Sequence, residues 1–128
     1  MKPRPTALVV EDDAIQRSMV TLLLEECEMR VIECDSAEDA VLVLQQAGVD
    51  FAMIYADVHL AGSMNGIELA QFARERFPDL HVVVTSGDLS AKLPHGATFM
   101  LKPWKSLDLL REAERSLQPS PRRQAWHR

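Results

Sequence analysis

The stretch Phe51-Ala52-Met53-Ile54-Tyr55-Ala56-Asp57 is an uninterrupted apolar run that ends in an aspartate. A continuous apolar run of strand length is typical of a strand that is buried on both faces of a parallel sheet. It is the longest such run in the chain, and it is far shorter than the roughly 20 residues that span a membrane. We therefore expect a central strand at Phe51–Ala56 with Asp57 directly after it, and no membrane-spanning segment.

Strand-like and helix-like segments alternate on both sides of this run. Short apolar runs predict further strands at residues 7–10, 30–34, 81–85 and 98–101. Helical spacing of apolar residues predicts helices at residues 15–27, 37–47, 66–77 and 105–117. This alternation predicts an α/β fold in which helices cover both faces of a doubly wound, five-stranded parallel sheet. Functional side chains in such folds gather at the carboxyl ends of the strands.

The buried faces of two helices are predicted from the spacing of their apolar residues. We expect the first helix to face the sheet with Ile15, Met19, Leu22, Leu23 and Cys27. We expect the last helix to face the sheet with Leu107, Leu110, Ala113 and Leu117. For the second helix, Ser36 is the predicted N-cap and Gly48 the predicted terminator.

The composition is that of one globular domain, with 128 residues of which 47% are hydrophobic and 26% are charged. The net charge is −5, and residues 119–128 contribute three arginines and no acid, which leaves −8 on residues 1–118. Such a surface disfavours binding to nucleic acids and to anionic membranes. We expect an N-terminal extension at residues 1–5, one domain at 6–118 and a flexible basic tail at 119–128.

The two cysteines, Cys27 and Cys34, are too few for a disulfide framework and do not form a C-x-x-C motif. We expect both to be reduced thiols. Lys2 and Arg4 lie near the start of the chain, but no apolar stretch of signal-peptide length follows them. Together these features favour a cytoplasmic protein.

Polar residues follow four of the predicted strands at their carboxyl ends. They are Glu11-Asp12-Asp13, Asp57, Thr85-Ser86-Gly87 and Lys102-Pro103. At about 4 Å and an effective dielectric constant of about 20, each pair of like charges costs roughly 4 kcal/mol. Glu11, Asp12 and Asp57 therefore need counter-charges, and Lys102 supplies only one of them. A divalent cation would balance the remaining two negative charges, and carboxylate ligands favour Mg²⁺.

A site of this kind has the chemistry of a phosphoryl acceptor. An aspartate oxygen attacks phosphorus as a nucleophile. A metal ion and a lysine stabilise the oxygens of the transferring group. The hydroxyl of Ser86 can hydrogen-bond to the phosphoryl group once that group has arrived.

These segments together resemble the response-regulator receiver domain of two-component signalling, over residues 6–118. The matching segments are Val9-Val10-Glu11-Asp12-Asp13, Asp57, Met64-Asn65-Gly66, Val84-Thr85-Ser86-Gly87 and Phe99-Met100-Leu101-Lys102-Pro103. The resemblance implies the flavodoxin-like strand order 2-1-3-4-5. It also implies a phosphoprotein of a phosphorelay, in which the signal is an aspartyl phosphate.

The resemblance also implies roles for the acids and the lysine. Asp57 is the phosphoacceptor, and Lys102 stabilises the phosphoryl group. Glu11, Asp12, Asp57 and the backbone carbonyl of His59 hold Mg²⁺, with Asp12 as a direct ligand.

Three further roles follow from the resemblance, and Trp104 is considered beside them. Ser86 resembles the switch hydroxyl, because it directly precedes the small residue of its motif, and Thr85 is the less favoured choice. Phe99 resembles the switch aromatic, although an aromatic residue on a strand is often plain core. The peptide bond before Pro103 is expected to be cis. Trp104 either packs in the core or helps a partner to dock.

Two segments depart from the family pattern. The spacing from Asp57 to Gly66 is one residue longer than usual, and Ala61 stands where proline is common, so the loop is expected to bulge slightly. The segment from Ser86 to Lys102 is about six residues short. The family's fourth helix, which lies between the fourth and fifth strands, is therefore expected to be short or absent. Many members of the family dimerise through the face that this helix helps to form. We therefore expect a monomer or a non-standard dimer.

We expect a receiver that takes a phosphoryl group from a histidine kinase or a histidine phosphotransfer protein and then presents a changed surface to an unknown downstream protein. We expect no effector or DNA-binding domain after residue 117, an arrangement that resembles stand-alone regulators and the receivers of hybrid histidine kinases. We expect no enzyme activity beyond assistance to its own phosphorylation and dephosphorylation. The alternative is a receiver-like scaffold that is never phosphorylated. A phosphohydrolase is disfavoured because His59, and not an acid, stands two residues after Asp57.

Overall fold

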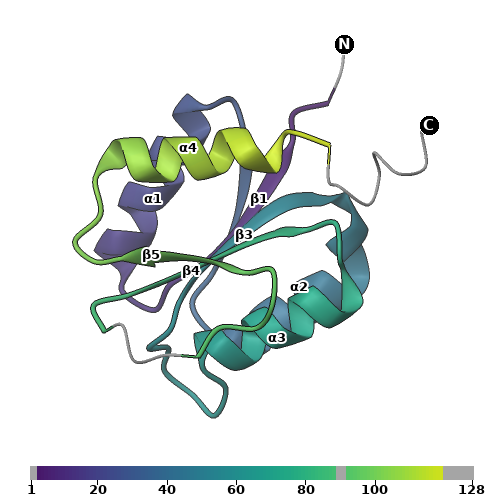
Figure 1. The fold of residues 1–128 in the computed structure, drawn as a ribbon, viewed down its shortest axis with the longest axis vertical. Helices are drawn as coiled ribbons and strands as arrows, with labels where there is room; N and C mark the ends of the chain where they lie inside the picture. Colours follow the sequence, from purple (N-terminus) through teal and green to yellow (C-terminus); the bar gives the residue numbers. More distant parts are fainter. Residues whose placement is uncertain (1–2, 89–91, 120–128) are drawn as a thin grey trace.

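The computed structural model describes residues 3–88 and 92–119 (Figure 1). Along these residues the strands are β1 (Thr6–Val10), β2 (Arg30–Cys34), β3 (Phe51–Asp57), β4 (His81–Ser86) and β5 (Thr98–Leu101). The helices are α1 (Ala14–Glu26), α2 (Ala37–Ala47), the short 3₁₀ helix η1 (Gly48–Asp50), α3 (Gly66–Arg76) and α4 (Ser106–Ser116). Apart from Pro119, the predicted tail lies outside the described residues. None of the described helices is long and apolar enough to cross a membrane.

The strands form one parallel sheet in the order β2-β1-β3-β4-β5, which confirms the predicted fold class and the central place of β3. Helices α1 and α4 cover one face and α2 and α3 the other (Figure 1). Side chains alternate between the faces along each strand. Ile54 accordingly packs towards α2 and α3, and Tyr55 towards α1 and α4. The register aligns Val10 with Ala56 and Asp57 with Thr85, so β1, β3 and β4 end at the same edge.

The face that α1 buries differs from the prediction. Val20 and Leu24 are fully buried, whereas Ile15 is 83% exposed and both Met19 and Leu22 are also exposed. Apolar residues surround much of this helix, so their spacing is compatible with more than one buried face. Packing against the sheet and α4 selects the face of Val20 and Leu24. The prediction for Ile15, Met19 and Leu22 is therefore wrong, and these three residues form an exposed apolar row, the α1 row.

Helix α4 buries only part of the predicted face: Ala113 is buried as predicted, but the prediction for Leu107 and Leu117 is wrong. Leu107 and Leu117 are exposed, whereas Leu109 and Glu112 are buried. A pattern of apolar residues predicts that Glu112 is exposed, because carboxylates are rarely buried unless they are paired. Here the carboxylate is paired with His81 Nε2 and with an arginine of the same helix, each at 2.8 Å. These two partners compensate for the loss of water and allow the acid to face the sheet.

No helix occurs between β4 and β5 in the described residues 87–88 and 92–97, in agreement with the expected short or absent fourth helix. Arg74 of α3 contacts this segment instead. Its Nε donates to the carbonyl of His95 at 3.2 Å, and its Nη1 donates to the carbonyl of Pro78 at 2.9 Å. Gly96 has φ +86°, and a Cβ there would lie 2.6 Å from the Arg74 guanidinium. A side chain at position 96 would therefore displace the arginine that holds the segment.

Both predicted ends of α2 are confirmed. Ser36 is the N-cap, and its side chain accepts a hydrogen bond from the backbone N–H of Asp39 at 3.2 Å. Gly48 is the C-cap, with φ −57°. A Cβ on Gly48 would lie 2.4 Å from the ring of Phe77. The glycine is therefore needed for space against Phe77 and not for an unusual backbone conformation.

Candidate functional site

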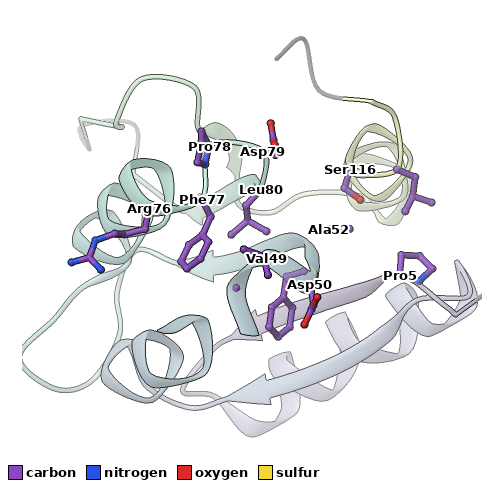
Figure 2. Close-up of a pocket in the computed structure, with 13 residues that line it drawn as sticks. Pro5, Val49, Asp50, Ala52, Arg76, Phe77, Pro78, Asp79, Leu80 and Ser116 are labelled. Atoms are coloured by element: carbon purple, nitrogen blue, oxygen red, sulfur yellow. The ribbon is translucent and has the colours of Figure 1, made fainter. Parts of the chain in front are cut away.

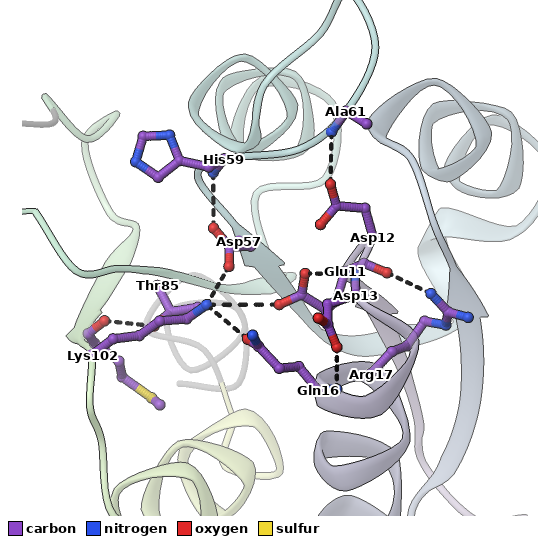
Figure 3. Close-up of polar contacts among 11 residues, drawn as sticks. Glu11, Asp12, Asp13, Gln16, Arg17, Asp57, His59, Ala61, Thr85 and Lys102 are labelled. Carbon is purple, nitrogen blue, oxygen red and sulfur yellow. Dashed lines mark hydrogen bonds and ion pairs between the residues drawn. The ribbon is translucent and has the colours of Figure 1, made fainter.

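The carboxyl edge of the sheet brings together the predicted acids and the predicted lysine (Figure 3). Glu11 directly follows β1, Asp57 is the last residue of β3, and Lys102 directly follows β5. Lys102 Nζ donates to Asp57 Oδ2. The same Nζ lies 3.7 Å from Glu11 Oε1. Parallel strands that end at one edge therefore place three distant sequence segments in one site.

Asp57 is held by the turn that follows β3. Its side chain is 8% exposed, and its Oδ1 accepts a hydrogen bond from the backbone N–H of His59 at 2.8 Å. The start of α3 packs against the same turn, where Gly66 N donates to the carbonyl of Val58 at 2.9 Å. A Cβ on Gly66 would lie 2.1 Å from the carbonyl oxygen of Asp57. The glycine of the Met64-Asn65-Gly66 segment is therefore required by the close approach of α3 to the Asp57 backbone.

Glu11 is a buried carboxylate with one oxygen that lacks a hydrogen bond. Its side chain is 2% exposed, and its Oε2 accepts from the backbone N–H of Asp13 at 3.1 Å. Its Oε1 has no hydrogen-bond partner among the described residues. Burial raises the pKa of Glu11 to about 7, and the hydrogen bond from Asp13 opposes this rise. An ionised carboxylate at this position is stabilised by a nearby cation.

The two aspartates that follow Glu11 serve different contacts. Asp12 is exposed, and its Oδ2 accepts from the backbone N–H of Ala61 at 3.1 Å, so it contacts the loop between β3 and α3. Asp13 is the N-cap of α1, and its Oδ1 accepts from the backbone N–H of Gln16 at 2.9 Å. Asp13 therefore begins the helix, and the exposed Asp12 joins the end of β1 to the loop after β3.

The donor set fits Mg²⁺. Within the described part of the chain, no three acidic, histidine or cysteine side chains are arranged as a cage around a metal. Mg²⁺ does not need such a cage, because it keeps several waters and is usually bound by one or two carboxylates. Glu11 Oε1 is buried and has no hydrogen-bond partner among the described residues, and Lys102 Nζ pairs with both this carboxylate and that of Asp57. These hard oxygen donors suit Mg²⁺.

The two hydroxyl residues at the end of β4 point to opposite faces of the sheet. Thr85 is fully buried, and its Oγ1 donates to the carbonyl of Met100 at 2.8 Å, which ties β4 to β5. Ser86 is 1% exposed, and its Oγ accepts from the backbone N–H of Asp88 at 3.1 Å. A hydroxyl that accepts can still donate its own proton. This geometry favours Ser86 over Thr85 as the hydroxyl that could reach a phosphoryl group.

The remaining predicted residues lie on β5 and just after it. Phe99 is half-buried, pairs in register with Val84, and lines a cavity of about 330 Å³ together with residues of α4. The peptide bond before Pro103 is cis, as the resemblance implied. Trp104 packs edge-on against Tyr55, with ring centroids 6.1 Å apart. Of the two readings of Trp104, packing is therefore observed.

Sequence reasoning missed Gln16 and Tyr55. Gln16 Oε1 accepts a hydrogen bond from Lys102 Nζ at 3.0 Å. Both missed residues line a cavity of about 410 Å³, the α1–Trp104 cavity, together with Met19, Lys102 and Trp104. Burial raises the pKa of Tyr55, so its hydroxyl stays neutral. Helical spacing could have placed Gln16 in the first turn of α1, but no sequence signal directs it to a lysine 86 residues away.

A separate cavity of about 540 Å³ lies near the N-terminal ends of β1, β3 and β4 (Figure 2). Its lining includes Val49, Asp50, Phe77 and Leu80. It shares no residue with the acidic site at the opposite end of the sheet. This cavity is therefore separate from the acidic site.

Comparison with known proteins agrees with this arrangement. The sequence matches the response regulator receiver domain over residues 7–114. The chain belongs to the response regulator receiver family. Receiver domains are the phosphorylated modules of two-component systems, generally bind Mg²⁺ at an acidic pocket, and interact with histidine kinases or phosphotransfer proteins. This receiver domain has the strand order β2-β1-β3-β4-β5 and an acidic carboxyl edge.

The receiver domain resembles proteins of very different length. The response regulator receiver protein CpdR of Brucella abortus is 31% identical to it over 116 residues, which cover 86% of this chain and 94% of CpdR. The autoinducer 1 sensor kinase/phosphatase LuxN of Vibrio campbellii is 32% identical over 84 residues, which cover 66% of this chain and 10% of LuxN. The chain therefore spans nearly all of one relative and about a tenth of the other.

Solved structures share the fold. The receiver domain of the hybrid histidine kinase CckA superimposes with a TM-score of 0.76 at 26% identity, covering 88% of this chain and 99% of that one. A response regulator receiver domain from Clostridium thermocellum superimposes with a TM-score of 0.80 at 18% identity, covering 88% and 94% of the two chains.

Proposed function

We propose that this receiver domain is a phosphorylation switch, in which Asp57 accepts a phosphoryl group from a phosphohistidine of a histidine kinase or a histidine phosphotransfer protein. The observation that supports this most is the pairing of Asp57 with Lys102 beside the buried Glu11, whose Oε1 has no hydrogen-bond partner in the described chain. These groups offer a nucleophile, a counter-charge and a place for a cation.

In the proposed transfer, one carboxylate oxygen of Asp57 forms a bond to phosphorus while the bond from phosphorus to the donor's imidazole nitrogen breaks. The electron pair of the broken bond stays on the imidazole. Lys102 stabilises the negative charge on the phosphoryl oxygens. Mg²⁺, held by Glu11, Asp12, Asp57 and the backbone carbonyl of His59, would supply further positive charge to those oxygens.

The proposed output involves Ser86 and Phe99. Ser86 moves so that its hydroxyl donates to a phosphoryl oxygen, and Phe99 follows inward. Ser86 lies at the end of β4, next to the strand that carries Asp57, which supports this step. The surface around β4 and β5 then changes, and a downstream protein binds to the changed surface.

The proposed donor protein covers the α1 row. The donor must approach Asp57 from solvent, and Met19 of this row lines the same cavity as Lys102. Ile15, Met19 and Leu22 are exposed at positions i, i+4 and i+7 of one helix. Apolar side chains at this spacing suit an apolar helix face of a partner protein. The α1 row would therefore bind the donor protein beside the site where Asp57 accepts the phosphoryl group.

We place this reaction in the cytoplasm, the usual location for the family, and we propose no catalytic activity beyond the domain's own phosphorylation and dephosphorylation.

A first experiment incubates the protein with acetyl phosphate or phosphoramidate, with and without Mg²⁺, and measures the intact mass. We expect a metal-dependent gain of one phosphoryl group, because the donor set fits Mg²⁺. The gain should be lost in Asp57→Asn and kept in Asp50→Asn, which removes an exposed acid at the other end of the sheet.

Two other outcomes would contradict the proposal. Labelling that persists in Asp57→Asn would point to another acceptor. A wild-type protein that gains no phosphoryl group and does not bind Mg²⁺ would instead be a receiver-like scaffold.

A further inference from the structure

Gln16 reaches from the first turn of α1 to the lysine of the acceptor site (Figure 3). Its Oε1 accepts a hydrogen bond from Lys102 Nζ at 3.0 Å. Its backbone N–H is bound by the N-cap Asp13 at 2.9 Å, which orients the start of the helix. Asp13 follows directly on the acidic pair. The same short segment therefore carries the acids and the residue that holds the lysine.

The three N–H groups of Lys102 face unequal partners. One donates to Asp57 Oδ2 and one to Gln16 Oε1. Glu11 Oε1 lies 3.7 Å from Nζ, which is too long for a hydrogen bond. Gln16 is thus the only uncharged side chain among these three, so it directs the ammonium without neutralising its charge.

We infer that Gln16 is a positioning residue, which holds the Lys102 ammonium in line with Asp57 and leaves its charge available for the transferred phosphoryl group. The inference rests on the proposed function of Asp57. A lysine side chain is long and rotates freely, so a second fixed acceptor restricts Nζ to the productive geometry. When Asp57 bonds to phosphorus, Lys102 turns from the Asp57 carboxylate towards the phosphoryl oxygens. The hydrogen bond to Gln16 then keeps Nζ in the site.

The surroundings of Gln16 permit a clean test. Gln16 is partly buried and lies on the wall of the α1–Trp104 cavity, beside Met19, Val20 and Trp104. The variant Gln16→Met keeps the length of the side chain, removes the acceptor and adds an apolar group to an apolar wall. We therefore expect it to fold with an unchanged melting temperature. Gln45→Met is the matched control, because Gln45 is exposed on α2.

The first readout needs no metal and no phosphoryl donor. In EDTA, acetylation of lysines by an N-hydroxysuccinimide ester is followed residue by residue with peptide mass spectrometry. Lys102 should react about threefold or more faster in Gln16→Met than in the wild type, because its amine is less firmly held. The exposed Lys105 serves as the internal reference. Gln16→Glu keeps an acceptor oxygen and should restore the protection of Lys102.

The second readout is the rate of phosphorylation by phosphoramidate with Mg²⁺. The maximal rate constant should fall by about three- to tenfold in Gln16→Met, with little change in the half-saturating donor concentration, because positioning acts on the transfer step. In a Lys102→Met background, Gln16→Met should cause no further loss, since it acts through the lysine.

The outcomes separate the inference from the proposed function. If the wild type takes up no phosphoryl group, the proposed function fails and the acetylation result still reports on the bond. If the wild type is phosphorylated and Gln16→Met equals it in both readouts, the inference is overturned. A loss of rate that persists in the Lys102→Met background would also overturn it. If Gln16→Met does not fold, comparison of Gln16→Glu with Gln16→Ala replaces it.

Discussion

At the scale of single residues, the acidic edge depends on how closely backbone and side chains approach one another. The start of α3 approaches the backbone carbonyl of Asp57 closely at Gly66, and Lys102 pairs with the Asp57 carboxylate. Glu11 is buried enough that its pKa rises to about 7, and the positive charge of Lys102 only partly offsets this rise. Small displacements of these residues therefore disturb their contacts, because protein interiors are closely packed.

Gly66→Ala tests the close approach beneath Asp57. The new Cβ would lie 2.1 Å from the Asp57 carbonyl oxygen, and backbone atoms cannot yield as a flexible side chain would. We expect the free energy of unfolding to fall by about 2 kcal/mol or more and phosphorylation to slow, because α3 must shift. Urea unfolding and the intact-mass assay measure these two effects.

Gly87→Ala is the matched control for this variant. A Cβ at Gly87 meets no atom within 4 Å, so its stability should stay within about 0.5 kcal/mol of the wild type. If the two alanine variants were equally stable, the close approach at Gly66 would not matter.

The thiol of Cys34 should be nearly unreactive in the folded protein. Burial, followed by the charges of Asp39 and Asp35, raises its pKa from 9.0 to about 11. The thiolate is the reactive form, so at pH 8 alkylation of Cys34 should be roughly a hundredfold slower in the folded than in the unfolded chain. Because the folded pKa is raised, the corresponding contribution to stability is present below pH 9.0 and is lost as the pH rises through about 11.

Iodoacetamide alkylation from pH 7 to 11, followed by peptide mass spectrometry, measures this rate. The unfolded chain in urea is the control. Equal rates in native buffer and in urea at pH 8 would contradict the prediction.

At the scale of elements, hydrogen bonds from Arg74 anchor the described residues between β4 and β5 to α3. Arg74 donates to the carbonyls of His95, Pro78 and Leu80 at 3.2, 2.9 and 3.3 Å. These bonds join the α3 helix to the chain on both sides of β4. Residues 92–97 form no helix, but these hydrogen bonds anchor them to α3.

Arg74→Met should lower the free energy of unfolding by about 1–3 kcal/mol, because it removes hydrogen bonds from a charged donor to backbone carbonyls. Urea unfolding measures the change. Arg76→Met on the same helix is the control. Its guanidinium lies 5.1 Å from the Phe72 ring centroid at an exposed position, so a loss of less than about 1 kcal/mol is expected. Similar losses in both variants would mean that Arg74 has no special role.

At the scale of the whole molecule, the lack of a helix in the described residues between β4 and β5 bears on assembly. Family members that dimerise through the fourth helix and the elements after it need a face that the described residues between β4 and β5 do not build. We expect this receiver domain to remain a monomer, or at most to form a different dimer, whether or not Asp57 carries a phosphoryl mimic.

Sedimentation velocity with and without beryllofluoride and Mg²⁺ measures this, with Asp57→Asn as the control for binding of the mimic. An unchanged sedimentation coefficient at micromolar concentrations is the expected result. A tight dimer that appears only with the mimic would contradict this prediction.

The order of the elements could be read from the sequence, because apolar runs and helical spacing are local properties of the chain. Strand β5 was predicted with its observed bounds, and the predicted helices agree with the observed ones to within about one residue at each end. The pairing of Asp57 with Lys102 was also predictable, because parallel strands must end at a common edge and polar residues follow those ends. These features depend on residue type and spacing alone.

The tertiary structure decided the features that depend on which partner a side chain meets. Glu112 is buried because His81 and an arginine of α4 pair with it, and α1 turns Val20 inward and leaves Ile15 in solvent. Gln16 reaches Lys102 because α1 and the end of β5 converge at one edge. No local pattern encodes such contacts, since burial and pairing energies arise only when distant segments are packed together.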